Sequence, residues 1–141
     1  MEPLDLSGLP EHALLLLDTP PLICWFEAHP ELGPRFRPLF EAHRDGGVRF
    51  AVTTISLAEV MTGPLQSNDE ALARRYRNIL ESWQIVELDA AIAENAARLR
   101  AAARLKLPEA VQAASALAVN ADALITHDRD FSRLKSLRVL S

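Results

Sequence analysis

Four consecutive leucines that run straight into an aspartate limit most strongly what this chain can fold into. The segment ALLLLDTPP places residues 14–17 directly before Asp18, Thr19 and two prolines. An apolar run that is this short and has no polar alternation is typical of a strand covered on both faces. We therefore predict a buried strand at residues 12–19, with the carboxylate of Asp18 held rigidly at its carboxyl end.

The size and composition of the chain indicate one domain. Its 141 residues are 49% apolar, enough for one core, so we expect a single domain over residues 1–141, with residues 1–11 as a loosely ordered extension. Cys24 is the only cysteine, which excludes an internal disulfide and favours a reducing compartment. Residues 1–17 contain no lysine or arginine, unlike a signal peptide, and no apolar run reaches the ~20 residues of a membrane span. We expect a cytoplasmic protein with no membrane partner.

Strand and helix patterns alternate along the rest of the chain. β-Branched and apolar runs predict strands at 48–54, 84–89 and 121–128, with an edge strand at 137–141. Helical periodicity predicts helices at 22–30, 34–47, 55–64, 67–83, from Asp89 to Ala103, and 108–119. Ser67 with Glu70, and Asp89, have the spacing of N-terminal caps. This order predicts an α/β fold with a mainly parallel sheet covered on both faces.

Acidic residues occur where these strands end. Asp18 and Asp128 close two strands, Glu59 follows the strand at 48–54 by about one helical turn, and Glu109 lies in the first turn of an alanine-rich helix. The carboxyl ends of parallel strands form one edge of a sheet, where ligands bind, so we expect these acids to face one crevice. Hydroxyl groups at the same strand ends are candidates for supporting the acids, namely those of Thr19, Thr54 and Thr126.

Each acid also has a purely structural interpretation. Asp18 can cap the helix that follows it, and Ser56 with Glu59 matches a capping box. Glu109 after Pro108 can favour a helix N-terminus through the helix dipole. Asp128 can begin a turn. Taken together these interpretations are weaker, because carboxylates gathered at one edge repel one another unless a cation lies among them.

Oxygen ligands of this kind favour Mg²⁺ or Mn²⁺ over zinc or copper. Such a site polarises a phosphoryl oxygen and activates water, so phosphodiester hydrolysis is the expected chemistry. The net charge of −4 argues against avid, non-specific binding of nucleic acid. The basic residues nevertheless cluster along the chain, at 74–77, 98–104 and 129–138, which is also the pattern of exposed helix faces.

Three segments together resemble a known family. LLLLDT, TTISLAEVMTGP and LKLPEAVQAASALAVNADALITHDRDF are similar to the PIN domain, in particular to the VapC-type toxin ribonucleases of bacterial toxin–antitoxin systems. The resemblance implies a three-layer α/β/α sandwich and an endoribonuclease that uses Mg²⁺ or Mn²⁺. By position it implies that the catalytic and metal-binding acids are Asp18, Glu59, Glu109 and Asp128, with Asp130 as an accessory ligand. Arg129 and Arg133 are then candidates for contacting the RNA backbone.

Two positions depart from the family pattern. Pro20 replaces a small polar residue after Asp-Thr, and Glu109 replaces a shorter aspartate. Mg²⁺ demands near-ideal octahedral geometry, so the added methylene of Glu109 lowers activity if it displaces the metal. We expect an active enzyme; the alternative is a weakened PIN-like module that binds RNA or a protein partner without efficient cleavage.

The resemblance also implies partners. A small antitoxin protein is expected to neutralise the enzyme, and a homodimer is expected. Apolar residues after Asp18 are candidates for such a contact or for ordinary core packing, namely Leu22, Ile23, Trp25 and Phe26.

Overall fold

The computed structural model describes residues 2–128, 131 and 134–141 of the chain. In these residues, five strands form one parallel sheet in the order β3-β2-β1-β4-β5. β1 lies at its centre and pairs Leu15 with Phe50 of β2 and Leu16 with Leu124 of β4. The strands are β1 (Ala13–Leu17), β2 (Val48–Thr53), β3 (Gln84–Val86), β4 (Ala123–Ile125) and β5 (Val139–Leu140).

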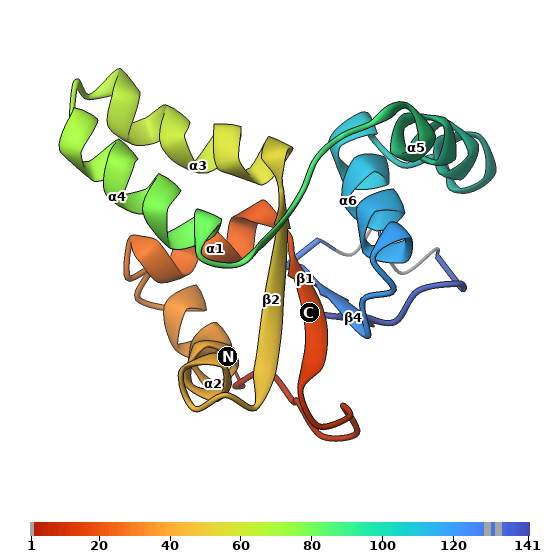
Figure 1. Ribbon diagram of the computed structural model, residues 1–141. Helices are drawn as coiled ribbons and strands as arrows, with labels where there is room; N and C mark the ends of the chain where they lie inside the picture. The colour runs from red at the N-terminus through yellow and green to blue at the C-terminus, as the bar shows by residue number, and fades with distance from the viewer. Residues whose placement is uncertain (1, 129–130, 132–133) are drawn as a thin grey trace.

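Helices cover both faces of this sheet, which confirms the three-layer α/β/α sandwich. In Figure 1, α1 to α4 lie on one side of the strands, and α5 and α6 lie on the other. The helices are α1 (Thr19–Phe26), α2 (Leu32–Arg44), α3 (Thr54–Gln66), α4 (Glu70–Glu81), α5 (Ala90–Ala103) and α6 (Leu107–Ala118).

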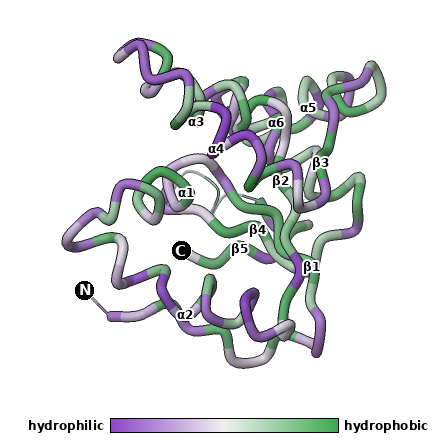
Figure 2. The backbone as a smooth tube through the Cα atoms, turned by 60° about the vertical axis from the view of Figure 1, so that its left-hand side comes forward, coloured by the Kyte–Doolittle hydropathy of each residue, from purple (hydrophilic) through white to green (hydrophobic). Residues whose placement is uncertain are grey.

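The leucine run is continuous because β1 supplies two cores at once. Leu15 and Leu17 pack in the core beneath α1 to α4, whereas Leu14 and Leu16 pack in the core beneath α5 and α6. All five residues of β1 are buried, as the sequence predicted. Figure 2 shows the apolar strands enclosed between the two helical layers.

Several element boundaries differ from the predicted ones. α1 already begins at Thr19, and α3 continues past Gly63 and Pro64 to Gln66. Pro64 lies in the last turn of α3, where the loss of one N–H shortens the hydrogen-bond ladder without breaking the helix.

The helix caps differ as well. Asp69, not Ser67, caps α4 by accepting from Leu72 N at 3.0 Å. Asp89 caps α5 as predicted, accepting from Ile92 N at 2.8 Å.

The segment before β1 is anchored at Leu4. Residues 2–12 contain no helix or strand. Leu4 is nevertheless buried, and its N–H donates to the carbonyl oxygen of Arg35 at 2.9 Å. This leucine therefore ties the extension to α2.

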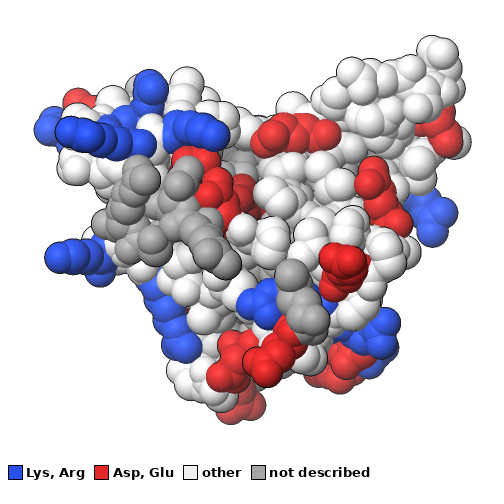
Figure 3. Space-filling model, turned by 180° about the vertical axis from the view of Figure 1, so that it is seen from behind, with Lys and Arg blue, Asp and Glu red and all other residues white. Residues whose placement is uncertain are grey.

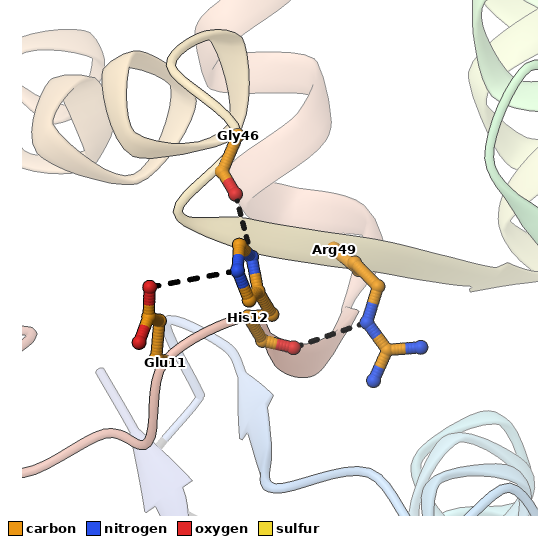
Figure 4. A network of polar contacts seen from close by, with 4 residues as sticks. All are labelled: Glu11, His12, Gly46 and Arg49. Atoms are coloured by element: carbon orange, nitrogen blue, oxygen red, sulfur yellow. Dashed lines mark hydrogen bonds and ion pairs between the residues drawn. The ribbon is translucent and has the colours of Figure 1, made fainter.

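A polar network lies where β1 begins (Figure 4). His12 Nδ1 is 2.9 Å from the carbonyl oxygen of Gly46, and Arg49 Nε donates to the carbonyl oxygen of His12 at 3.0 Å. Glu11 completes the network, with a carboxylate oxygen 3.6 Å from His12 Nε2. These contacts join the starts of β1 and β2 on the surface.

Candidate active site

Asp18 lies at the carboxyl end of β1, inside the protein. Its N–H donates to the carbonyl oxygen of Ile125 at 2.8 Å, which continues the pairing of β1 with β4. Its side chain accepts a hydrogen bond of 2.8 Å from Thr126 Oγ1 to Oδ2 and one of 3.1 Å from Gln112 Nε2 to Oδ1. Only 8% of the residue is exposed.

The two prolines explain why Asp18 does not cap α1. An N-cap side chain accepts from the N–H of the second or third helical residue. In α1, which begins at Thr19, these positions are Pro20 and Pro21, which have no N–H. Asp18 accordingly makes no side-chain capping bond, and its carboxylate is directed to Gln112 and Thr126 instead.

Glu59 is joined to Asp18 by a chain of hydrogen bonds. Gln112 Nε2 also donates to Ser56 Oγ at 2.8 Å, and Ser56 Oγ lies 2.8 Å from Thr19 Oγ1. Thr19 in turn donates to Glu59 Oε1 at 3.0 Å, so the Ser56 hydroxyl is the donor to Thr19. A continuous network therefore connects the buried acid to the exposed one, through α6, α3 and α1.

Thr53 caps α3, accepting from Ser56 N at 3.1 Å. Ser56 and Glu59 therefore do not form the alternative capping box, and Glu59 remains available to Thr19. Thr53 is buried, whereas Thr54, the predicted supporting residue, is the first residue of the helix. The hydroxyl of Thr54 forms no hydrogen bond with another residue in the described part of the chain.

Burial dominates the electrostatics of Asp18. Desolvation raises the pKa of its carboxyl group above the usual range. Hydrogen bonds from Thr126, from the backbone of Thr19 and from Gln112 act in the opposite direction, and the negative charge of Glu59 raises the pKa further. The two acids are thus close enough to repel each other.

Glu109 and Asp128 lie beside this network but have structural contacts of their own. Glu109 Oε2 is 3.2 Å from Lys106 N, at the N-terminus of α6, and the N–H of Asp128 donates to Thr126 Oγ1 at 2.9 Å. Among the described residues, no three Asp, Glu, His or Cys side chains form a group that could hold one metal ion. The expected gathering of four acids is therefore not seen in these side-chain positions. Asp130, Arg129 and Arg133 lie outside the described residues.

The sequence reasoning missed two members of the network, Ser56 and Gln112. Both are buried, and Gln112 uses its Nε2 group for both Asp18 and Ser56. Its Oε1 is buried and has no hydrogen-bond partner among the described residues. The available signal was an amide side chain three residues after Glu109, in an alanine-rich helix.

The surface at this edge is hollowed. Figure 3 shows carboxylates gathered in a depression between the arm formed by α3 and α4 and the arm formed by α5 and α6. Lysine and arginine side chains line the rim on the α5 and α6 side. No helix in the described residues is long and apolar enough to cross a membrane.

Comparison with solved structures gives proteins of the same fold. The chain is 28% identical to a chain of a toxin–antitoxin complex from Klebsiella pneumoniae, with a TM-score of 0.71 over 90% of this chain and 96% of that one. VapBC2 from Rickettsia felis, bound to a DNA fragment from its promoter, is 21% identical, with a TM-score of 0.69 over 89% and 96%. VapC20 from Mycobacterium tuberculosis, a toxin that cleaves the sarcin–ricin loop, is 15% identical, with a TM-score of 0.68 over 84% and 92%.

A comparison with curated proteins gives no match. The family model described as PIN domain matches residues 15–137, which include the last three residues of β1, Asp18 and the six helices described above. The chain therefore belongs to the PIN domain family.

Proposed function

We propose that the protein is a metal-dependent endoribonuclease that hydrolyses RNA phosphodiester bonds and acts as the toxin of a toxin–antitoxin pair. The observation that carries this proposal is the buried Asp18, linked through Gln112, Ser56 and Thr19 to Glu59. The similarity to a toxin–antitoxin complex and to a toxin that cleaves the sarcin–ricin loop supports it.

The chemistry of the donors fits a hard divalent cation. Asp18 and Glu59 provide carboxylate oxygens, the ligands that Mg²⁺ and Mn²⁺ prefer. Burial and the neighbouring Glu59 both disfavour the charged form of Asp18, and a cation would relieve both effects. We propose Asp18 and Glu59 as the principal ligands, with Glu109 and Asp128 as additional ligands and catalytic acids. The accessory role of Asp130 is part of the same proposal.

The chain positions these acids before any substrate arrives. Thr126, Gln112 and the backbone of Thr19 donate hydrogen bonds that orient the Asp18 carboxylate. Thr19 orients Glu59 in the same way. A bound cation would polarise a phosphoryl oxygen and promote attack by water.

One observation favours the alternative of a weakened module. The carboxylate of Glu109 approaches the backbone N–H of Lys106, a capping contact that competes with metal binding. In this alternative the protein binds RNA or a partner and cleaves poorly.

A cleavage assay separates the two functions. Purified protein is incubated with a pool of structured RNA and Mn²⁺, beside the Asp18→Asn and Glu109→Asp variants. Cleavage by the wild type that Asp18→Asn abolishes supports the nuclease. If only the Glu109→Asp variant cleaves RNA, the weakened module is supported. If none of the three proteins cleaves RNA, the nuclease function is contradicted.

We propose an antitoxin partner because the chain is similar to a chain of the toxin–antitoxin complex from Klebsiella pneumoniae and to VapBC2 from Rickettsia felis. The surface proposed for this contact, or for a homodimer, is a hollow of about 360 Å³ between α1, α2 and α4. Half-buried Trp25 stacks there on Phe40, and Phe26 stacks on Tyr76, with ring centroids 4.5 and 4.8 Å apart. Leu22, in contrast, is fully buried and belongs to the core. Co-expression with the product of an adjacent short reading frame, followed by size-exclusion chromatography, tests the partner.

A further inference from the structure

Three basic side chains surround the turn between α5 and α6. Arg100 lies in the last turn of α5, Arg104 is the residue after that helix, and Lys106 immediately precedes α6. We call these three residues the α5–α6 ridge. All three are exposed, and none forms an ion pair with another described residue. Arg77 and Arg98, in contrast, lie 2.6 and 3.9 Å from Glu81 and Glu94.

The ridge adjoins the candidate active site through α6. Lys106 is the N-cap of α6, and Glu109 and Gln112 follow it at intervals of three residues along the helix. Lys106 N contacts Glu109 Oε2, and Gln112 donates to Asp18. At ~1.5 Å per residue, about 9 Å of helix separates Lys106 from the residue that touches Asp18. Figure 3 shows basic side chains at the rim beside the carboxylates.

The backbone fixes the direction of the ridge. Arg100 Nε donates to the carbonyl oxygen of Leu105 at 3.2 Å, which holds its guanidinium group over the turn. Arg104 has φ 56° and ψ 37°, the left-handed conformation in which glycine is the usual residue at the end of a helix. The turn thus carries the long cationic side chain of Arg104 at a position where the backbone conformation favours glycine.

An RNA chain needs such a surface to approach this site. The protein carries a net charge of −4, and the hollow is lined with carboxylates that repel phosphate. Arginine and lysine bind phosphate oxygens through charge-assisted hydrogen bonds, and arginine does so in bidentate fashion. We propose that the α5–α6 ridge binds the RNA backbone beside the bond that is cleaved. This inference rests on the proposed nuclease function and adds where the substrate strand lies.

Binding is measured with a fluorescein-labelled RNA stem-loop in the Asp18→Asn background, by anisotropy over a series of salt concentrations. The ridge variant is Arg104→Gly with Lys106→Gln. Glycine suits the backbone at 104, and the Lys106 N–H contact with Glu109 survives the second change. The matched control, Arg37→Gln with Arg44→Gln, removes the same charge from exposed positions of α2, at the opposite end of the molecule. Arg104→Lys with Lys106→Arg keeps the charge of the ridge.

We expect the ridge variant to bind about 10-fold more weakly. The slope of log K against log salt should become shallower by about 1.4, because each single-strand phosphate contact contributes ~0.7. The α2 control should change affinity less than 2-fold, about the loss expected from net charge alone. The charge-keeping variant should bind as the parent does.

Equal weakening by the ridge and α2 variants would overturn the proposal, as would an unchanged salt slope or a parent that binds no RNA. Cleavage by the wild type, measured separately, tests the nuclease. If the wild type cleaves RNA but the ridge variant binds RNA as well as its parent does, this inference alone is refuted. If RNA binds through the ridge but the wild type does not cleave it, the nuclease function alone is refuted.

Discussion

The two ends of β1 carry polar networks of opposite character. At the start of the strand, the side chains of His12 and Glu11 are 64% and 87% exposed, and water competes for every contact (Figure 4). At its end, Asp18 is buried, and its partners Gln112 and Thr126 lie 94 and 108 residues away in sequence. The same strand therefore carries an exposed network at its start and, at its end, a buried network whose members come together only when the whole chain has folded.

The difference in exposure indicates which of the two networks contributes to function. Exposed ion pairs and hydrogen bonds contribute little to stability, because solvent replaces them at small cost. A buried carboxylate is costly unless it is fully partnered, and perturbed acids of this kind concentrate at functional sites. We therefore expect changes at Asp18 to affect activity strongly, and changes at Glu11 or Arg49 to affect it little.

The largest effect is expected for Asp18→Asn. Removing one oxygen ligand should lower RNA cleavage by more than about 100-fold, because changes that only disturb the residues supporting a metal site already cost 10–100-fold. The fold should survive. The oxygen of asparagine can keep accepting from Gln112 Nε2, and its amide group then faces Thr126 Oγ1, whose hydroxyl reorients to accept. Initial rates of cleavage and far-UV circular dichroism check both parts, and a variant that cleaves normally would remove Asp18 from the mechanism.

Gln112→Leu should have the next largest effect. It removes the donor to Asp18 Oδ1 and to Ser56 Oγ but keeps a side chain of similar size. We expect the Mn²⁺ concentration for half-maximal cleavage to rise about 10-fold, with most of the rate recovered at saturating metal. Ser115→Ala is the matched control, because Ser115 is also buried on α6 and its hydroxyl has no hydrogen-bond partner among the described residues. Identical behaviour of the two variants would show that Gln112 only fills space.

A pH series should reveal the cost of burying Asp18. Its folded-state pKa is raised above the ordinary 3.8, so the native protein holds a proton that the unfolded chain releases. The contribution of Asp18 to the free energy of unfolding is therefore most favourable below about pH 4 and is lost as the pH rises through the raised pKa. Relative to Asp18→Asn, the wild type should lose stability in urea unfolding as the pH rises from about 4 through the raised pKa. A difference that stays constant with pH would mean that burial does not perturb the carboxyl group.

The smallest effect is expected at the start of β1. Glu11→Gln and Arg49→Gln remove charges from exposed positions, so the free energy of unfolding should change by less than about 0.5 kcal/mol. Cleavage should be unaffected. Thermal denaturation and the same cleavage assay check this, and a loss of activity comparable with that of Gln112→Leu would break the contrast between the two ends.

The fold was predictable because its main signals are local. The leucine run could be buried on both faces only as a central strand, and the alternation of elements indicated parallel pairing. The first residue of a helix was less predictable where several neighbouring residues could act as its N-terminal cap. Thr53, Thr54 and Ser56 are all plausible caps, and only the path of the backbone selects Thr53.

The site was predictable only in part. The position of Asp18 at the carboxyl end of a buried strand was predictable because the leucine run before it is visible in the sequence. Gln112 was not found, because an amide in a helix belongs to no motif and its contact with Asp18 depends on how α6 packs against β1. The position of the Glu109 carboxylate likewise depends on its contact with the N–H of Lys106, which the amino-acid composition does not reveal.

Thermal denaturation with and without Mn²⁺ shows whether the buried Asp18 carboxylate binds a divalent cation. At a concentration of about 100 times the dissociation constant, bound Mn²⁺ should stabilise the wild type by ~2.7 kcal/mol. At about 4 °C per kcal/mol for a chain of this length, the midpoint should rise by about 10 °C. We expect this rise for the wild type and little or none for Asp18→Asn, whereas equal rises in the two proteins would show that Mn²⁺ does not bind at Asp18.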